Sequence, residues 1–200
     1  MKLRFLLVAI VFLIGVFAIF AVGVRRGGSS ARSAPPIWEA FAAEHIRGWS
    51  IPSDAKRLTN PVAGTAEMLK RGREHWADHC ANCHANNGSG ETEMGRNLYP
   101  RVPDMRGEKT QSLSDGELYY IIRNGVPMTG MPAWGDVKLG NNDMETWMLV
   151  SFIRHLPSLA ADEQSAMEKL NPKSEMEREE EQEESDFLSG KTTKEKTHEH

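Results

Sequence analysis

Two cysteines and a histidine lie within a five-residue stretch of the chain, Cys-Ala-Asn-Cys-His at residues 80–84. Cys80 and Cys83 are the only two cysteines among the 200 residues. Thiols at this spacing lie on one turn of chain, where they can form thioether bonds to the two vinyl groups of one haem. The adjacent His84 can then bind the haem iron as its proximal ligand. The motif therefore predicts one covalently attached haem c.

Two other chemistries use paired cysteines, and the surrounding sequence argues against both. A redox-active pair of the thioredoxin type needs a strand–helix–strand context, and no such pattern surrounds residues 80–84. A zinc site usually has four ligands, often from two such pairs, and the chain has no second pair. His198 and His200 could bind a metal only weakly, because they lie in a polar terminus. Haem attachment is therefore the favoured chemistry.

The second axial ligand of the iron would have to come from elsewhere in the chain. A loop rich in glycine and proline, residues 124–134, carries two candidates, Met128 and Met131. Met131 precedes Pro132, which restricts the backbone and favours an extended conformation at the methionine. This would hold a thioether at one place, so Met131 is the favoured ligand. Met128 is the alternative, although packing in the core explains it better.

The two motifs together resemble class I cytochromes c, in which the distal methionine lies in a Gly-Met-Pro loop before the last helix. The matching residues here are Gly130-Met131-Pro132. The resemblance covers residues 64–158 and implies that His84 and Met131 are the iron ligands. It also implies an all-α cytochrome c fold, with three to four helices around one covalently bound haem.

The segment before the cysteine motif predicts a helix over residues 65–79, with Thr65 as its cap. Apolar and small residues share one face of this helix at three- and four-residue spacing: Met68, Leu69, Gly72, Trp76 and Cys80. Glycine inside a helix costs about 1 kcal/mol relative to alanine, so Gly72 needs a structural reason. We expect the last helix to cross there, with Phe152 or Leu149 in the notch.

Two later helices have clear boundary signals. Residues 142–156 are strongly apolar, and Asn142 is the expected cap of this last helix. Residues 115–124 predict a middle helix, which begins with a capping box at Ser114 and ends at Gly125. No segment of the chain predicts a strand.

The region between the motif and the middle helix, residues 85–113, is rich in Gly, Asn, Pro and charge and predicts irregular structure. A proximal histidine normally donates its second ring proton to an outer acceptor. In the family this acceptor is a carbonyl in a proline-containing turn, which implies Pro103 here, or else Pro100. Three further side chains could reach the haem carboxylates: Tyr99, Arg101 and Trp134.

The N-terminal segment has the composition of a membrane span. Residues 3–24 contain one charge, Arg4, and twenty helical residues at about 1.5 Å each reach roughly 30 Å. The apolar run exceeds that of a cleaved signal peptide, so we expect residues 1–25 to form an anchor. Because the family attaches haem outside the bacterial cytoplasmic membrane, the resemblance implies a single-pass protein with a periplasmic haem domain.

A linker, residues 26–63, joins the anchor to the haem domain. Within it, residues 37–49 place mostly apolar side chains, with one histidine, at helical spacing: Trp38, Phe41, Ala42, His45, Ile46 and Trp49. This amphipathic helix could lie at the membrane surface, against a partner subunit, or on its own haem domain.

The C-terminal segment, residues 159–200, is acidic and has few apolar side chains, so it predicts a disordered tail. The formal net charge of −4 comes largely from this tail, which could offer a negative surface to a basic partner. Charges in residues 60–160 nearly balance, so nothing indicates binding to nucleic acid.

With His84 and Met131 on the iron, the resemblance implies a one-electron carrier that cycles between Fe(II) and Fe(III). Its partners would be redox proteins in the membrane or periplasm. No enzyme activity and no small-molecule substrate are expected, because no iron position would be open. A fixed haem subunit of a respiratory or photosynthetic complex is one alternative. A ligand-binding sensor or enzyme is another, and it would need an open sixth position.

Overall fold

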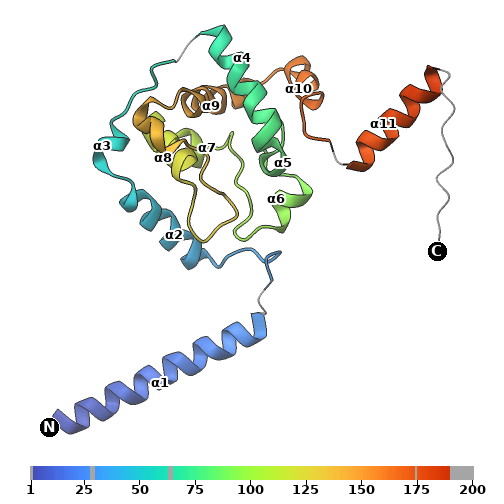
Figure 1. The fold of residues 1–200 in the computed structure, drawn as a ribbon. Coiled ribbons are helices and arrows are strands. Elements are labelled where there is room, and N and C mark those ends of the chain that lie inside the picture. The colour runs from blue at the N-terminus through green and yellow to red at the C-terminus, as the bar shows by residue number, and fades with distance from the viewer. Residues whose placement is uncertain (1, 28–29, 63–64, 174, 190–200) are drawn as a thin grey trace, which may run out of the picture.

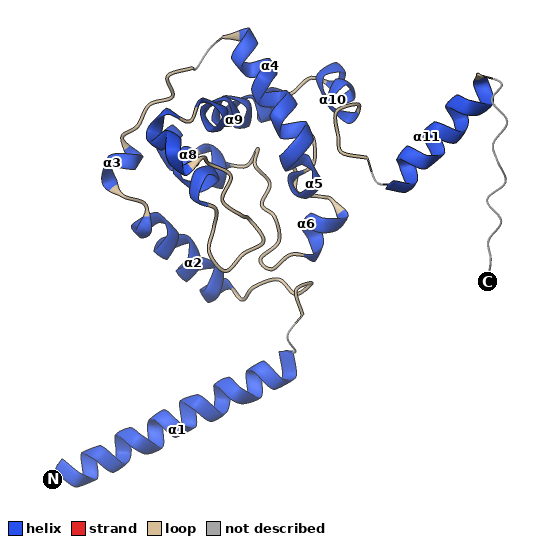
Figure 2. Cartoon of the chain, viewed as in Figure 1, coloured by secondary structure: helices blue, strands red, loops and turns tan. Residues whose placement is uncertain are grey.

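The structure, a computed structural model, describes residues 2–27, 30–62, 65–173 and 175–189. Within these ranges it contains helices and loops but no strand (Figures 1 and 2). The predicted all-α class is therefore confirmed. Three helices of 10 to 12 residues form the core, which agrees with the expected three to four, and several shorter helices occur in addition.

Three helices form the core of the domain: α4 (Ala66–His75), α8 (Asp115–Asn124) and α9 (Met144–His155). α4 and α9 cross at Gly72, where an added Cβ would lie 2.2 Å from the carbonyl oxygen of Met148 and 3.2 Å from the Cβ of Phe152. The predicted close crossing is confirmed. However, the backbone of Met148, rather than Leu149, fills the notch together with Phe152.

The side chains around this crossing form one buried cluster. The largest of them are almost inaccessible to solvent: Trp76, Tyr119, Trp147, Phe152 and Ile153. The rings of Tyr119 and Trp147 stack with their centroids 4.0 Å apart, which joins α8 to α9. Burial of several large aromatic groups supplies much of the stability of so small a domain.

Local capping signals correctly predict where two of the long helices begin. The hydroxyl of Thr65 accepts a hydrogen bond from the backbone N–H of Met68 at the start of α4 (3.3 Å). Ser114 and Glu117 form the predicted capping box of α8. Gly125 follows the last residue of α8 with a φ of 68°, a left-handed conformation that favours glycine.

The predicted cap of α9 is wrong by one residue. Asn142 ends a 3₁₀ helix, Val137–Asn142, and Asp143 caps α9 instead. The buried carboxylate of Asp143 accepts hydrogen bonds from the backbone N–H of Thr146 (3.1 Å), its hydroxyl (3.0 Å) and the backbone N–H of Asp136 (3.1 Å). Because one carboxylate satisfies three donors, Asp143 is the better capping group.

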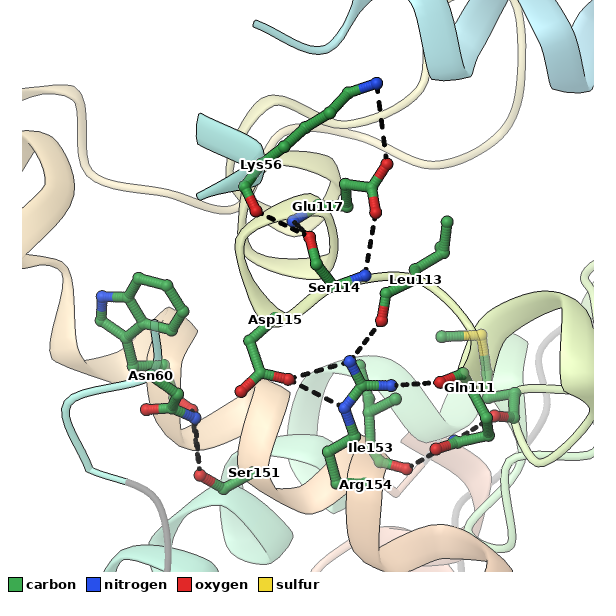
Figure 3. A network of polar contacts seen from close by, with 12 residues as sticks. Lys56, Asn60, Gln111, Leu113, Ser114, Asp115, Glu117, Ser151, Ile153 and Arg154 are labelled. Carbon is green, nitrogen blue, oxygen red and sulfur yellow. Dashed lines mark hydrogen bonds and ion pairs between the residues drawn. The ribbon is translucent and has the colours of Figure 1, made fainter. Parts of the chain in front are cut away.

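A polar network joins the start of α8 to α9 (Figure 3). The guanidinium of Arg154 pairs with Asp115 (2.8 Å) and donates hydrogen bonds to the backbone carbonyls of Gln111 (2.8 Å) and Leu113. The side-chain amide of Gln111 donates in turn to the carbonyl of Ile153 (2.9 Å). These charge-assisted and amide bonds hold α9 against the N-terminal end of α8.

Shorter elements connect the long helices. They are α3 (Ser53–Lys56), α5 (Ala81–His84), α6 (Glu93–Asn97), α7 (Glu108–Gln111) and a 3₁₀ turn, Leu156–Ser158. Apart from α6 and α7, residues 85–113 are irregular, as predicted.

The C-terminal region is more ordered than its composition suggests. α10 (Ala161–Glu168) packs on the domain, and its Met167 is completely buried. Glu163 pairs with Arg73 on α4 and with His155 on α9, both at 2.8 Å. The predicted disorder of the C-terminal segment is therefore wrong for this helix, because one apolar side chain and two charge pairs hold it in place.

Beyond α10, the acidic helix α11 (Glu175–Leu188) is largely exposed where its side chains are described. This agrees with a solvated acidic segment. The weak metal-binding candidates His198 and His200 lie outside the described residues.

Two helices precede the helical core domain. α1 (Lys2–Gly27) contains a stretch, Arg4–Gly23, with a mean hydropathy of 3.2 and no buried residue, long enough to cross a membrane. α2 (Ile37–Ser50) forms where the amphipathic pattern predicts a helix. In Figure 1, α2 lies along the flank of the core domain, on the side from which α1 extends. Of the three packings that the pattern leaves open, contact with its own haem domain is therefore present.

Replacing Gly72 by alanine tests the helix crossing. The added methyl group would meet the Met148 carbonyl oxygen, so we expect the domain to lose about 1–3 kcal/mol of stability. The matched control is Gly48→Ala in α2, where an added Cβ meets nothing within 4 Å. Denaturant unfolding followed by circular dichroism measures both. Equal effects of the two substitutions would contradict the proposed close contact.

Truncating Met167 tests whether α10 belongs to the folded domain. Because this side chain is completely buried, Met167→Ala should cost about 2–5 kcal/mol of unfolding free energy. Leu170→Ala is the control, since Leu170 is 44% exposed and should cost far less. Thermal unfolding distinguishes the two, and an unchanged midpoint for Met167→Ala would show that α10 is not part of the core.

Candidate functional site

The cysteine motif lies where α4 changes its helical type. Trp76–Cys80 form a π-helical turn, and Ala81–His84 form α5. The predicted α-helix over residues 65–79 is therefore wrong for its last four residues. A π-helical turn accommodates one extra residue and is frequent at functional sites. The extra residue rotates Cys80 and the residues after it relative to the face of α4.

One cavity takes in all four predicted site residues. Cys80, Cys83, His84 and Met131 line a space of about 230 Å³, whereas a single water needs roughly 10–15 Å³. Most other lining side chains are apolar, including Leu98, Val102, Met105, Ile122, Leu149 and Ile153. This size and lining are those of a binding site for a mainly apolar group rather than of a packing defect.

The imidazole of His84 is suited to act as a neutral metal ligand. Burial lowers its pKa to about 4, so the ring is uncharged at neutral pH. Its centroid lies 5.4 Å from the ring of Trp76. The indole N–H of Trp76 donates a hydrogen bond to the carbonyl oxygen of Ala85 (3.0 Å). Trp76 therefore fixes both the histidine ring and the end of the motif.

The predicted hydrogen bond from His84 to a proline-turn carbonyl is not formed. Its Nδ1 atom is buried and has no partner, so the assignment to Pro103 or Pro100 is wrong. The carbonyl oxygens of Val102 and Pro103 instead face Gly90, 2.6 and 3.3 Å from where its Cβ would be. A buried polar atom without a partner costs about 1–3 kcal/mol, which points to a functional rather than a packing role for this ring.

The two cysteines are free thiols in an environment that disfavours the thiolate. Burial raises the pKa of Cys80 to about 12, and burial also raises that of Cys83. Reactive and zinc-binding cysteines need the thiolate form, which their surroundings usually stabilise. Among the residues the structure describes, no cluster of three or more His, Cys, Asp or Glu could hold a bare metal ion. The thioredoxin and zinc alternatives therefore gain no support.

Met131 is held by hydrogen bonds within its own loop. The N–H of Val126 donates to the carbonyl of Met131, and the N–H of Met131 donates to the hydroxyl of Thr129, both at 3.1 Å. A Cβ at Gly125 would lie 2.8 Å from the Met131 carbonyl oxygen, so a larger residue would displace the loop. The Met131 loop and His84 are far apart along the chain, yet both line the same cavity in the folded domain.

Met128, the alternative ligand, lies outside the cavity. Its side chain is 99% exposed, so its expected packing in the core is wrong. The backbone at Met128 is in the left-handed region (φ of 61°), and this turn directs the side chain to solvent. Of the two candidate methionines, only Met131 lines the cavity.

Polar side chains surround part of the cavity. Arg101 and Trp134 line it, whereas the third predicted residue, Tyr99, does not and donates a hydrogen bond to Glu39 of α2 (2.6 Å). Two further cations also line it and are absent from the predicted set: Arg47 and Lys109. The only sequence signal for Arg47 is its place opposite the apolar stripe of α2, far from the motif along the chain.

These residues fit a haem c. A neutral imidazole and a thioether suit haem iron, two thiols at the attachment spacing suit its vinyl groups, and apolar walls suit its ring. Cations at the edge suit its two carboxylates. The donor set and the cavity thus agree on one group.

Comparison with known proteins agrees with this interpretation of the site. Residues 67–153 match the family model described as cytochrome c oxidase, cbb3-type, subunit III. The cbb3-type cytochrome c oxidase subunit FixP of Azorhizobium caulinodans is 34% identical over 90 residues, which are 43% of this chain and 27% of that protein. The chain therefore matches only about a quarter of that relative's length. The family match includes the cysteine motif and the Met131 loop.

Covalent attachment can be tested by extraction. If Cys80 and Cys83 both carry thioether bonds, acidic acetone should leave the haem on the protein. Replacing both cysteines by serine should abolish this retention and leave little folded domain, because the haem would fill the central cavity. Asn82→Ser, an exposed change within the same motif, should retain its haem. Release of haem from the unmodified chain would refute covalent attachment.

Proposed function

We propose that the chain is a membrane-anchored electron carrier with one covalently bound haem c, because residues 67–153 match a family model of c-type cytochrome subunits and hold the attachment motif. The observation that carries this proposal is the shared cavity. Cys80, Cys83 and His84 of the cysteine motif line it together with Met131, which lies far from them along the chain.

The proposed ligands would leave no iron position for a substrate. When bound, haem supplies a reversible one-electron change between Fe(II) and Fe(III). His84 would bind the iron through a neutral nitrogen, and Met131 through a soft thioether. A thioether ligand favours the reduced state and raises the potential. The hydrogen-bonded loop around Met131 would keep the sulfur in place in both states.

The remaining residues would set the surroundings of the redox centre. Apolar side chains such as Ile122 and Leu149 line the cavity and would keep water from a bound haem. Arg47 and Arg101 would pair with the haem carboxylates at its edge. Fixed and mostly dry surroundings rearrange little when the iron gains or loses one electron, and this small rearrangement is the main requirement for rapid electron transfer.

The proposed redox partners are inferred from the membrane anchor α1 and from the name of the similar protein FixP. α1 would hold the domain at a bacterial cytoplasmic membrane in a single pass, with the haem domain on the periplasmic side. The relative is named as a subunit of a cbb3-type oxidase. We infer that this chain exchanges electrons with a membrane-bound oxidase or another respiratory complex. A fixed haem subunit of such a complex is equally compatible with the domain and differs from a carrier only in mobility.

Substitution of the two methionines tests the ligand assignment. Met131→Ala should abolish the weak near-red absorption of a sulfur–iron bond in the oxidised protein. It should also lower the midpoint potential, because the soft ligand that favours Fe(II) is lost. Met128→Ala is the matched control in the same loop and should change neither, since this side chain is 99% exposed. If Met128→Ala removed the band instead, the assignment of Met131 would be wrong, although the carrier function would stand.

A further inference from the structure

The amphipathic helix α2 has its apolar side turned away from the haem domain. Five large apolar side chains on it are between 62% and 91% exposed: Ile37, Trp38, Phe41, Ile46 and Trp49. Their spacing places them on one half of the helix surface. Soluble monomers rarely expose so many adjacent aromatic and aliphatic side chains without a function for them.

The opposite half of α2 contacts the haem domain mainly through polar groups. Glu39 accepts a hydrogen bond from Tyr99, and Glu44 pairs with Lys109. Near the end of the helix, the ammonium group of Lys56 donates to the carbonyl oxygen of Gly48. No residue of α2 is fully buried in this contact. Polar contacts therefore account for much of the hold of α2 on the domain, and its apolar half is left for another surface.

We propose that this apolar half of α2 lies in the lipid–water interface of the membrane that α1 enters. The inference rests on the anchor and not on the haem chemistry. Only residues 28–36 separate α1 from α2, so the connection spans at most about 30 Å even when fully extended. α2 therefore cannot move far from the bilayer surface, and its apolar half can always reach the lipid there.

The composition of the exposed half favours lipid over a protein partner. Trp38 and Trp49 lie near the two ends of the helix, with Phe41 and Ile46 between them. Tryptophan prefers the membrane interface, where its ring meets apolar chains and its N–H meets water. An amphipathic helix with this arrangement binds parallel to the membrane, with its apolar face at the boundary of headgroups and acyl chains.

This placement would orient the redox site. Glu44 and Arg47, on the domain side of α2, line the haem cavity. α2 would then lie between the cavity and the bilayer, with one face in lipid and the other at the site. Soluble redox partners would have to approach the domain from its other sides. Tethering by α1 alone would leave the domain free to rotate, whereas two contacts would fix which side faces the membrane.

Site-directed spin labelling of the full chain tests this proposal. A nitroxide is attached at Phe41→Cys or Trp49→Cys in α2, and at Glu67→Cys as the control. Glu67 is exposed in the first turn of α4, on the far side of the domain from α2 (Figure 1). The chains are inserted singly into nanodiscs of phosphatidylcholine and phosphatidylglycerol. The labels in α2 should be several-fold less accessible to a water-soluble nickel complex than the label at Glu67, and more accessible to oxygen.

Three outcomes would overturn the proposal. Equal nickel accessibility at Phe41 and Glu67 would show that α2 stays in water. Protection that appears only at high protein-to-lipid ratio would assign the apolar half to a second copy of the chain. Protection in native membranes but not in nanodiscs would assign it to a partner protein. The unmodified chain gives the background, because a label can react there only with Cys80 or Cys83. Labelling of this chain would count against haem attachment at these cysteines, and its signal can be subtracted from that of the variants.

Discussion

The contact between Gly72 and the backbone of Met148 is the constraint on which the rest of the domain depends. It lets α4 and α9 approach until their backbones touch. One turn later, at the start of the π-helical turn that follows α4, Trp76 enters the core, where its ring centroid lies 5.6 Å from that of Phe152 of α9 and 5.4 Å from that of His84. The same indole bonds the backbone at the end of the cysteine motif. The helix crossing thus determines where the histidine and the cysteines meet the cavity.

Signals that depend on neighbouring residues predicted the structure well. The capping box at Ser114 and the left-handed Gly125 need only local backbone geometry, and both are present. The cap of α9 was not predictable in this way, because Asn142 and Asp143 are equally good capping residues in sequence. Tertiary contacts decide between them, since Asp143 also accepts a hydrogen bond from Asp136.

Long-range contacts explain the remaining differences. The acidic composition after residue 158 predicted disorder, but Arg73 and His155 supply the partners that Glu163 needs. Periodicity predicted α2 as a helix but could not tell which half would face the domain. Glu39 and Glu44 find partners in Tyr99 and Lys109, and these contacts turn the apolar half outward. The cysteine motif and the Met131 loop could be found without knowledge of long-range contacts, because each is a run of adjacent residues with a recognisable chemistry.

The proposed electron transfer requires that both His84 and Met131 bind the haem iron, so that no iron position is left for another ligand. The most direct test is a redox titration of the full chain in detergent, with and without carbon monoxide. We expect a single one-electron wave and a reduced spectrum that carbon monoxide does not change, because no iron position would be open to a ligand. Ready binding of carbon monoxide by the unmodified reduced protein would contradict it and favour a sensor or an enzyme.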